Sequence, residues 1–202
     1  MTELYLLKTS EFEIDSKKLY QFPKERQERI QNAIKKEKAQ QLYAACLLLN
    51  YGLKKHGKKI KDVKINAYGK PYLDESLFFN LSHSQSYVAL VMDEKEVGID
   101  LQEKNKISNQ AAQLFLGQSF QNPSYVWTRK EAFLKCLGCG WKNKDAIKKD
   151  VLSQELIYAN TSYFFEDLPV LDAYYLSICS KRKLENITVK EVSKNELISN
   201  EF

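Results

Sequence analysis

Residues 78–102, FFNLSHSQSYVALVMDEKEVGIDLQ, contain two apolar runs that are typical of short buried strands. The first run, residues 87–92, follows a Ser-His-Ser triplet centred on His83, one of only two histidines in the chain. After a polar turn, a second run at residues 97–99 ends at the isolated carboxylate Asp100. Because rigid elements often hold functional groups at their ends, this stretch predicts a site with a histidine and an acid.

The Ser-His-Ser triplet does not indicate a serine hydrolase. On an extended strand, neighbouring side chains point to opposite faces, so Ser82 and Ser84 share one face and His83 takes the other. A Ser-His-Asp hydrolase needs hydrogen-bonded side chains from separate segments, and the chain has no G-x-S-x-G elbow. His83 is therefore either a structural histidine or a ligand contact.

Segments with helical periodicity lie on both sides of this stretch, and short β-type runs follow them. Ser108 is a suitable N-cap and Gly138 a suitable C-terminal stop for two of the helices. The order of elements predicts an α+β fold of two halves, residues 1–102 and 103–202, packed against each other. The predicted helices are 17–20, 23–36, 38–55, 108–115 and 125–137, and the predicted strands are 4–8, 63–66, 78–81, 87–92, 96–101 and four short runs after residue 154.

The composition is that of a globular protein with a mildly basic surface. The 202 residues are 44% hydrophobic, which is enough for a buried core, and the formal net charge is +5. The positive charge suits an anionic partner, although solvated lysines alone would also produce it. No apolar run is long enough to span a bilayer, and the first residues lack the pattern of a signal peptide. We therefore expect a soluble, cytoplasmic protein that does not enter a membrane.

Two of the four cysteines, Cys136 and Cys139, form a C-x-x-C motif. A structural zinc site would need a second pair of ligands, and the chain offers none at a suitable spacing. A thioredoxin-like motif would lie early in a βαβ unit and not after a helix. The cysteines are therefore expected to be reduced thiols.

A second acid, Glu131, lies on the predicted helix 125–137, four residues before Lys135. This spacing places Glu131 and Lys135 on one helix face, where they would form at least a surface ion pair. If the fold also brings Asp100 close, two carboxylates could hold Mg²⁺, which typically takes one or two of them together with phosphate oxygens and water. Nearby lysines would suit a polyphosphate ligand, although no Walker loop or dinucleotide fingerprint is present.

Three sequence blocks in one order resemble the 4′-phosphopantetheinyl transferase superfamily, in its larger pseudo-dimeric class typified by the surfactin-synthetase-activating enzyme. The blocks are Gly-Lys-Pro at residues 69–71, FNLSHS at residues 79–84 running on to VGID at residues 97–100, and WTRKEAFLK at residues 127–135. The resemblance implies two similar halves related by a pseudo-twofold axis, with the active site at their interface. It also implies a monomer.

The resemblance implies that the chain moves the phosphopantetheine arm of coenzyme A (CoA) to a serine of an apo acyl or peptidyl carrier protein. The by-product would be adenosine 3′,5′-bisphosphate. Asp100 and Glu131 correspond to Mg²⁺ ligands, Glu131 also to a candidate base, and Lys135 to a phosphate contact. These three are the expected catalytic residues, and the expected CoA contacts are Lys70, Pro71, Ser82, His83, Lys130 and Lys135.

The chain departs from the family pattern at residue 102. The family often has a second acid two residues after Asp100, whereas this chain has Gln102, which could bind Mg²⁺ only through its carbonyl oxygen or a water molecule. The segment from Asp100 to Trp127 also lacks the usual F-[ST]-x-x-E element. The basic residues expected near the CoA 3′-phosphate cannot be aligned, and the candidates are Lys24, Arg26, Arg29, Lys36 and Lys38.

Two other functions remain open at this point. A relative that binds CoA or a nucleotide without turnover would explain the missing acid at Gln102. A basic nucleic-acid-binding protein would explain the net charge, although the sequence contains no recognisable nucleic-acid-binding module. The apolar residues Phe115, Leu116, Phe120 and Tyr125 either pack in the core or contact a carrier protein.

Overall fold

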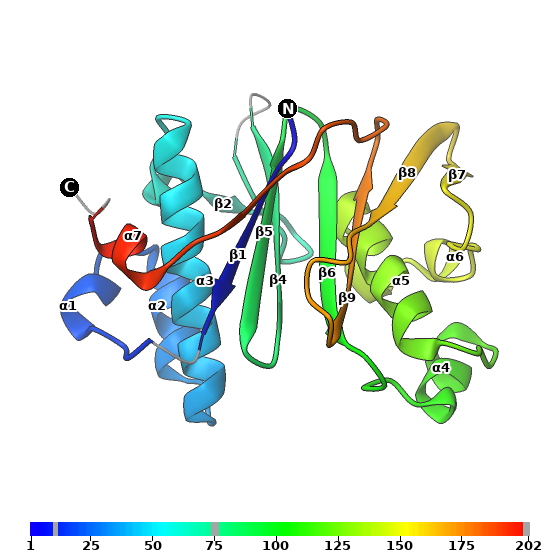
Figure 1. Ribbon diagram of the computed structural model, residues 1–202, viewed down its shortest axis with the longest axis horizontal. Helices are drawn as coiled ribbons and strands as arrows, with labels where there is room; N and C mark the ends of the chain where they lie inside the picture. The colour runs from blue at the N-terminus through cyan, green and yellow to red at the C-terminus, as the bar shows by residue number, and fades with distance from the viewer. Residues whose placement is uncertain (10–11, 74–76, 200–202) are drawn as a thin grey trace.

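The structure, a computed structural model, describes residues 1–9, 12–73 and 77–199. Two four-stranded sheets form the middle of the molecule, and helices cover their outer faces (Figure 1). The predicted α+β class is confirmed. The helices are α1 Ser16–Leu19, α2 Lys24–Gln31, α3 Lys36–Lys55, α4 Asn109–Leu116, α5 Pro123–Leu137, α6 Lys144–Ile147 and α7 Lys194–Ser199, with short 3₁₀ turns η1 Ile60–Asp62 and η2 Gly140–Lys142.

The first sheet has the order β10-β1-β5-β4 and the second the order β6-β9-β8-β7. Neighbouring strands are antiparallel, except that β1 and β10 are parallel. A separate two-stranded hairpin pairs β2 with β3. The strands are β1 Glu3–Lys8, β2 Lys64–Ile65, β3 Pro71–Tyr72, β4 Phe78–Ser84, β5 Tyr87–Asp93, β6 Val97–Glu103, β7 Glu155–Tyr158, β8 Thr161–Asp167, β9 Tyr174–Ser180 and β10 Thr188–Glu191.

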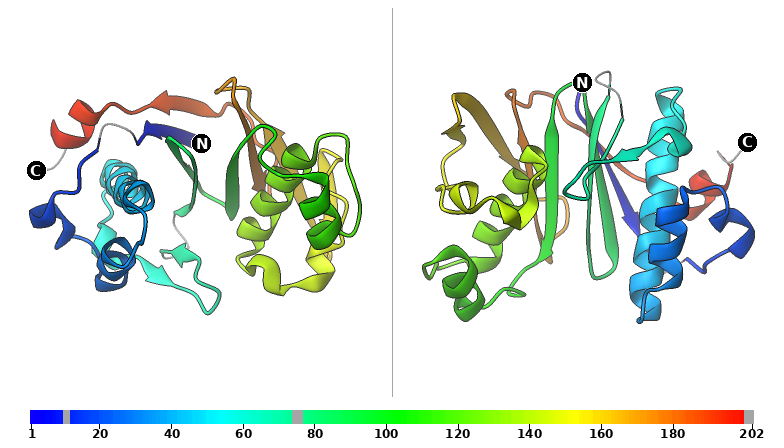
Figure 2. Two further views of the ribbon diagram at one scale, coloured as in Figure 1. Left: turned by 90° about the horizontal axis from the view of Figure 1, so that it is seen from below. Right: turned by 180° about the vertical axis from the view of Figure 1, so that it is seen from behind.

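The change from one sheet to the other occurs between β5 and β6, at residues 94–96, whereas the predicted boundary between the halves lies at residue 102. Strand β6, which carries Asp100, therefore belongs to the second sheet. The end of the chain returns to the first sheet, where β10 pairs with β1 and α7 packs beside α3 (Figures 1 and 2). The sequence pattern could not show this crossing, because alternation identifies a strand but not its neighbours.

Three apolar layers hold the elements together. One core lies between α3 and the first sheet, and a second lies between α5 and the second sheet. The third fills the space between the two sheets, where Leu4, Leu6 and Val91 meet Ile99 and Ile178. Figure 2 shows the resulting order of helix, sheet, sheet and helix across the molecule.

Strands β4 and β6 lie side by side, although they belong to different sheets (Figure 1). Three polar side chains of β4 accept hydrogen bonds from backbone amides of β6. Asn80 Oδ1 accepts from Ile99 (3.0 Å), Ser82 Oγ from Leu101 (3.1 Å) and Ser84 Oγ from Glu103 (3.2 Å). These contacts satisfy buried amides that a backbone ladder would otherwise pair. They explain why polar residues recur at every second position of β4.

Helix α5 packs against β6 at Gly98. A Cβ atom at this position would overlap with the backbone oxygen of Ala132 and the backbone nitrogen of Cys136. The absence of a side chain therefore permits the close approach of helix and strand. Because Asp100 is two residues beyond Gly98, its side chain points to the same face of β6, toward α5.

Replacing Arg182 with alanine is expected to lower the free energy of unfolding by about 1–3 kcal/mol. Arg182 donates from Nε to Asp93 Oδ1 (3.0 Å) and from Nη2 to Asp93 Oδ2 (2.7 Å), and Asp93 is buried at the end of β5. Without Arg182, this carboxylate would lose its cationic partner in the interior. Urea denaturation measures the loss, and replacing the exposed neighbour Lys183 with alanine is the control, which should change stability by less than about 0.5 kcal/mol.

The stability difference should also depend on pH. Burial raises the pKa of Asp93, but hydrogen bonds from Arg182, Thr2 and the amide of Lys95 outweigh burial and hold the pKa below its ordinary value. A depressed pKa stabilises the fold above the unfolded-state pKa of about 4, and this contribution is lost as pH falls through the folded-state pKa. The difference between wild type and Arg182→Ala should therefore be largest at neutral pH and shrink in acid. A difference that is constant with pH would contradict the assignment.

Candidate active site

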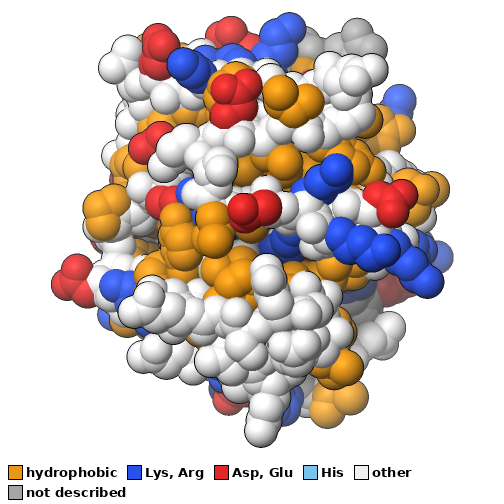
Figure 3. Space-filling view, turned by 90° about the vertical axis from the view of Figure 1, so that its right-hand side faces the viewer, with side chains coloured by type: hydrophobic (Ala, Val, Ile, Leu, Met, Phe, Trp, Pro, Cys, Tyr) orange, Lys and Arg blue, Asp and Glu red, His pale blue; other side chains and the backbone are white. Residues whose placement is uncertain are grey.

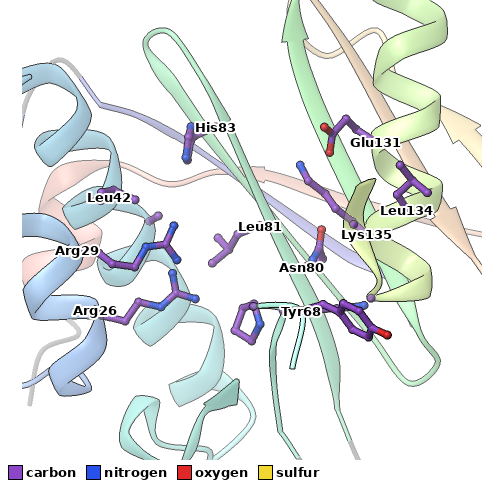
Figure 4. Close-up of a pocket in the computed structure, with 16 residues that line it drawn as sticks. Arg26, Arg29, Leu42, Tyr68, Asn80, Leu81, His83, Glu131, Leu134 and Lys135 are labelled. Carbon is purple, nitrogen blue, oxygen red and sulfur yellow. The ribbon is translucent and has the colours of Figure 1, made fainter. Parts of the chain in front are cut away.

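A cavity of about 320 Å³ lies between α2 and α3 on one side and α5 on the other. Strand β4 forms its floor through Leu81 and His83, and the turn at residues 68–71 closes one end. Figure 4 shows Arg26 and Arg29 pointing into the cavity from one wall and Glu131 and Lys135 from the other. The cavity thus takes its lining from one strand of the first sheet and from the helices that cover both sheets.

Asp100 is paired with Lys135 beside the cavity. Lys135 Nζ lies 2.6 Å from Asp100 Oδ1, and Ser82 Oγ donates to the same oxygen at 2.7 Å. Lys135 Nζ also donates to Ser82 Oγ (3.2 Å). Asp100 is only 5% exposed, so the ammonium of Lys135 lies next to it in a poorly solvated place. The strand end and the helix face predicted from the sequence therefore meet.

Glu131 lies on the cavity wall, one helical turn before Lys135. The indole Nε1 of Trp141 donates to Glu131 Oε1 at 2.5 Å. Burial is the main cause that raises the pKa of Glu131 above its ordinary value, and the charge of Asp100 adds to it. The Lys135 ammonium and the Trp141 hydrogen bond act in the opposite direction. Glu131 is therefore a carboxylate that takes up a proton more readily than usual, as a general base requires.

His83 points toward the helical wall and not toward Asp100. Its Nε2 lies 3.0 Å from Lys38 Nζ, so the ammonium donates and the ring is neutral. Burial is the main cause that lowers the pKa of His83 to about 4, and the nearby charges of Lys38 and Lys135 contribute to this lowering. His83 is thus a neutral hydrogen-bonding group at pH 7, consistent with the opposite faces expected for His83 and Ser82.

The turn before β3 is organised by the side chain of Asn66. Its Oδ1 accepts from the amides of Tyr68 and Lys70, both at 2.9 Å, and its Nδ2 donates to the carbonyl of Gly138 at 3.1 Å. Gly69 has a φ of 87°, which a residue with a side chain rarely adopts. The turn therefore connects the first half of the chain to the end of α5.

Lys70 and Pro71 both line the cavity. The ammonium of Lys70, however, donates to the carbonyls of Val97 (3.2 Å) and Cys136 (3.3 Å). Burial lowers the pKa of Lys70. In this structure the lysine therefore joins β6 to α5, and contact with a phosphate would need its side chain to move.

Besides Asp100, three predicted site residues do not line the cavity. Ser82 faces β6, where it holds Asp100. Lys130 points to the far side of α5, where its Nζ donates to the carbonyl of Lys149. Lys130 thus points away from the cavity, because one residue along a helix turns the side chain by about 100° from that of Glu131. Gln102 shares the α5-facing side of β6 with Asp100 but lies beyond the cavity wall.

Among the basic residues of the N-terminal helices, Arg26 and Arg29 line the cavity (Figure 4). Lys38 contacts His83. Burial lowers the pKa of Arg26, which shows that its guanidinium is partly removed from water. Together with Lys135, these groups make a cavity that favours a ligand with several negative charges.

The side-chain oxygen atoms of Asp100, Glu131 and Gln102 are suited to a hard divalent cation that takes few of its ligands from the protein. Within the described residues there is no cluster of three or more His, Cys, Asp or Glu side chains suited to a metal. Asp100 and Glu131 nevertheless lie close enough for the charge of Asp100 to raise the pKa of Glu131. The carbonyl oxygen of Gln102 lies on the same face of β6 as Asp100. Two carboxylates and an amide oxygen are ligands that Mg²⁺ accepts, provided that phosphate and water complete the shell.

Hydrophobic side chains gather on the outer side of the second half (Figure 3). Leu114 is 77% exposed and Phe115 is 52% exposed, both on α4. Leu116, Phe120 and Tyr125 are partly buried against the core under α5. Of the four apolar residues considered in the sequence, only Phe115 has a largely exposed side chain. All four cysteines are free thiols, and no helix of the described residues is long and apolar enough to span a membrane.

Sequence reasoning missed Trp141, Asn66 and Asn80. Trp141 lies in Leu-Gly-Cys-Gly-Trp, beyond the glycine that ends the helix, so periodicity gives no indication of its partner. Asn80, Ser82 and Ser84 occupy alternate positions in the sequence. This pattern could have indicated a strand whose side chains accept hydrogen bonds from the backbone of a neighbouring strand.

Two known proteins are similar in sequence to this chain. No protein-family model matches the chain. The 4′-phosphopantetheinyl transferase gsp of Aneurinibacillus migulanus is 27% identical over 154 residues, which cover 65% of this chain and 64% of that protein. The 4′-phosphopantetheinyl transferase of Bacillus subtilis is 28% identical over 91 residues, which cover 38% of this chain and 41% of that protein. The matches span less than two thirds of either relative, and they confirm the resemblance predicted from the three blocks.

Proposed function

Because this chain is a relative of the 4′-phosphopantetheinyl transferases, we propose that it transfers the 4′-phosphopantetheine arm of CoA to a serine of an apo carrier protein. The observation that carries the proposal is the meeting of Asp100, Glu131 and Lys135 beside a cavity lined with arginines. The second product would be adenosine 3′,5′-bisphosphate. The two sheet-and-helix halves would be related by a pseudo-twofold axis, and the protein would act as a monomer.

The cationic wall of the cavity would hold the nucleotide end of CoA. Arg26 and Arg29 would contact its phosphates, because guanidinium groups bind phosphate oxygens in a bidentate way. His83 is neutral and hydrogen-bonded to Lys38, so it would contribute a hydrogen bond and not a charge. Lys70 and Pro71 would shape the end of the cavity beside the turn.

The chemical step would be a displacement at phosphorus. The oxygen of the carrier serine forms a bond to the phosphorus that bears pantetheine, and the bond from that phosphorus to the bridging oxygen of adenosine 3′,5′-bisphosphate breaks. Glu131 accepts the serine proton, directly or through water, which its raised pKa favours. Lys135 donates to phosphate oxygens as negative charge builds up on them.

The carboxylates of Asp100 and Glu131 would hold Mg²⁺, with the carbonyl of Gln102 as a third contact. Bound Mg²⁺ would neutralise charge on the pyrophosphate. In the structure Lys135 neutralises Asp100 instead, through the 2.6 Å ion pair. Lys135 is thus able to turn from the carboxylate to the phosphates when the charge of Asp100 is otherwise balanced.

The proposal is tested by incubating the purified chain with CoA, Mg²⁺ and a panel of apo carrier proteins of the fatty-acid, polyketide and nonribosomal-peptide types. We expect at least one carrier to gain the mass of one phosphopantetheine group, and that carrier would identify the pathway. Reactions without CoA and reactions with a carrier whose serine is changed to alanine are the controls. No gain on any carrier, with CoA binding shown by calorimetry, would instead favour a binding protein without turnover.

Replacing Gln102 with glutamate is expected to keep transfer active and to lower the Mg²⁺ concentration required for half-maximal rate. The substitution adds a negative oxygen ligand on the same strand face as Asp100, and carboxylates bind Mg²⁺ more strongly than an amide carbonyl does. The matched control is Glu103→Gln, on the opposite face of β6, which should leave the Mg²⁺ requirement unchanged. A severe loss of activity in Gln102→Glu would show that the neutral amide has a role of its own.

A further inference from the structure

Trp141 contacts Glu131 from outside the helix that carries it. The indole Nε1 donates to Glu131 Oε1 at 2.5 Å, and the ring packs on Trp127 with centroids 4.7 Å apart. Phe115 of α4 completes the cluster, with its ring edge against both tryptophans at 5.6 Å and 6.0 Å. The indole is therefore held by ring contacts from two helices, and its only polar atom is directed at a carboxylate of the site.

The turn after α5 brings Trp141 back to the helix. Gly138 and Gly140 have φ values of 72° and 55°, in the left-handed region that glycine adopts without strain. The chain therefore reverses within three residues, and Trp141 in η2 lies beside a residue ten positions earlier. The carbonyl of Gly138 accepts from Asn66 Nδ2 (3.1 Å), which ties this turn to the other half of the molecule.

We propose that Trp141 is a positioning residue that fixes the carboxylate of Glu131 for cation and substrate binding, an inference that rests on the proposed function. The side chain of Glu131 has three rotatable bonds, and a hydrogen bond to one oxygen restricts the rotation of its carboxylate. Hydrogen bonds to a ligating carboxylate typically change metal affinity by about 10–100-fold. The rings of Trp127 and Phe115 hold the indole in place, so that the hydrogen bond restricts Glu131 more than a mobile donor would.

The first test measures the hydrogen bond itself. The chain has two tryptophans, so Trp127→Phe leaves a single indole N–H signal in an NMR spectrum, that of Trp141. We expect this signal to move when Mg²⁺ alone is added, and to move upfield in the double variant with Glu131→Ala. A Trp141 signal that stays in place while calorimetry shows Mg²⁺ binding would overturn the inference. This measurement does not require any substitution of Trp141 to fold.

The second test separates positioning from packing. Trp141→Phe keeps an aromatic ring on Trp127 but removes the N–H donor, whereas Trp127→Phe removes indole area from the same cluster and leaves the donor. We expect Trp141→Phe to weaken Mg²⁺ binding by about tenfold and to raise the KM for Mg²⁺ by a similar factor, and Trp127→Phe to change both by less than about twofold. Equal effects of the two variants would show a packing role only.

The outcomes distinguish this inference from the proposed function. A wild-type chain that neither binds Mg²⁺ nor modifies any carrier contradicts the proposed function, and the inference fails with it. A wild-type chain that transfers phosphopantetheine, with Trp141→Phe no different from Trp127→Phe, contradicts the role of Trp141 alone.

Discussion

Replacing Asp100 or Glu131 with alanine is expected to abolish phosphopantetheine transfer and to leave the fold intact. Asp100 lies on β6 and Glu131 lies on α5, and the charge of Asp100 raises the pKa of Glu131. Removing one would take away charge stabilisation that is typically worth several kcal/mol in the transition state. Because each 1.36 kcal/mol is a factor of ten, the rate should fall by about a thousandfold or more. Initial rates of carrier modification at saturating CoA measure the effect.

Isosteric variants and a neighbouring acid serve as controls. Asp100→Asn keeps the shape of the side chain and a carbonyl oxygen that accepts from Ser82, so its loss of activity would report the charge and not the packing. Glu103→Ala removes a carboxylate from the same strand, but from the opposite face, and should retain wild-type activity. Circular dichroism and thermal melting confirm that each variant is folded. Near-normal rates in Asp100→Ala or Glu131→Ala would contradict the proposal that both carboxylates are required for transfer.

Replacing Gly98 with alanine is expected to disable the site without touching any charged residue. The added methyl group would overlap with backbone atoms of Ala132 and Cys136, which cannot rotate away as a side chain could. Helix α5 would have to move off β6, and overpacking of this kind costs typically 1–3 kcal/mol. Glu131 and Lys135 neighbour these two helix residues, so the shift would separate them from Asp100. Transfer should fall by at least about a hundredfold, since a misplacement of 1 Å is enough for such a loss.

Gly52→Ala is the matched control for Gly98→Ala. Gly52 also lies where a helix packs on a sheet, but its added Cβ would meet the sulfur of Met92 at 2.6 Å and a methyl group of Leu90 at 2.9 Å. These are side-chain atoms, and the flexible Met92 thioether is able to adjust. Alanine also favours the helical conformation over glycine by about 1 kcal/mol, which offsets part of the cost. We expect Gly52→Ala to retain most stability and activity. Similar losses in both variants would show that backbone overlap at Gly98 is not the cause.

Much of the local structure could be predicted from the sequence. The predicted helix 125–137 is confirmed as α5, and Ser108 caps α4 by accepting from the amide of Ala111 at 3.2 Å. A helix and its N-cap depend on residues within about one helical turn of each other, so a short stretch of sequence is enough to predict them. The two separate helices predicted at 23–36 and 38–55 are confirmed as α2 and α3, but α2 ends earlier than predicted, at Gln31, and residues 32–35 connect it to α3. The short helices α6 and α7 were not predicted, since four to six residues carry little periodic signal.

Within one element, the sequence predicted which side chains of the site share a face. Alternation placed Ser82 and His83 on opposite faces, and a spacing of four placed Glu131 and Lys135 on one face. Which elements meet depends on tertiary packing. It assigned β6 to the second sheet and directed Trp141 to Glu131. The physical reason is that periodicity defines the direction of a side chain relative to its own element, whereas the partner depends on packing between residues far apart in the chain, as at Gly98 and α5.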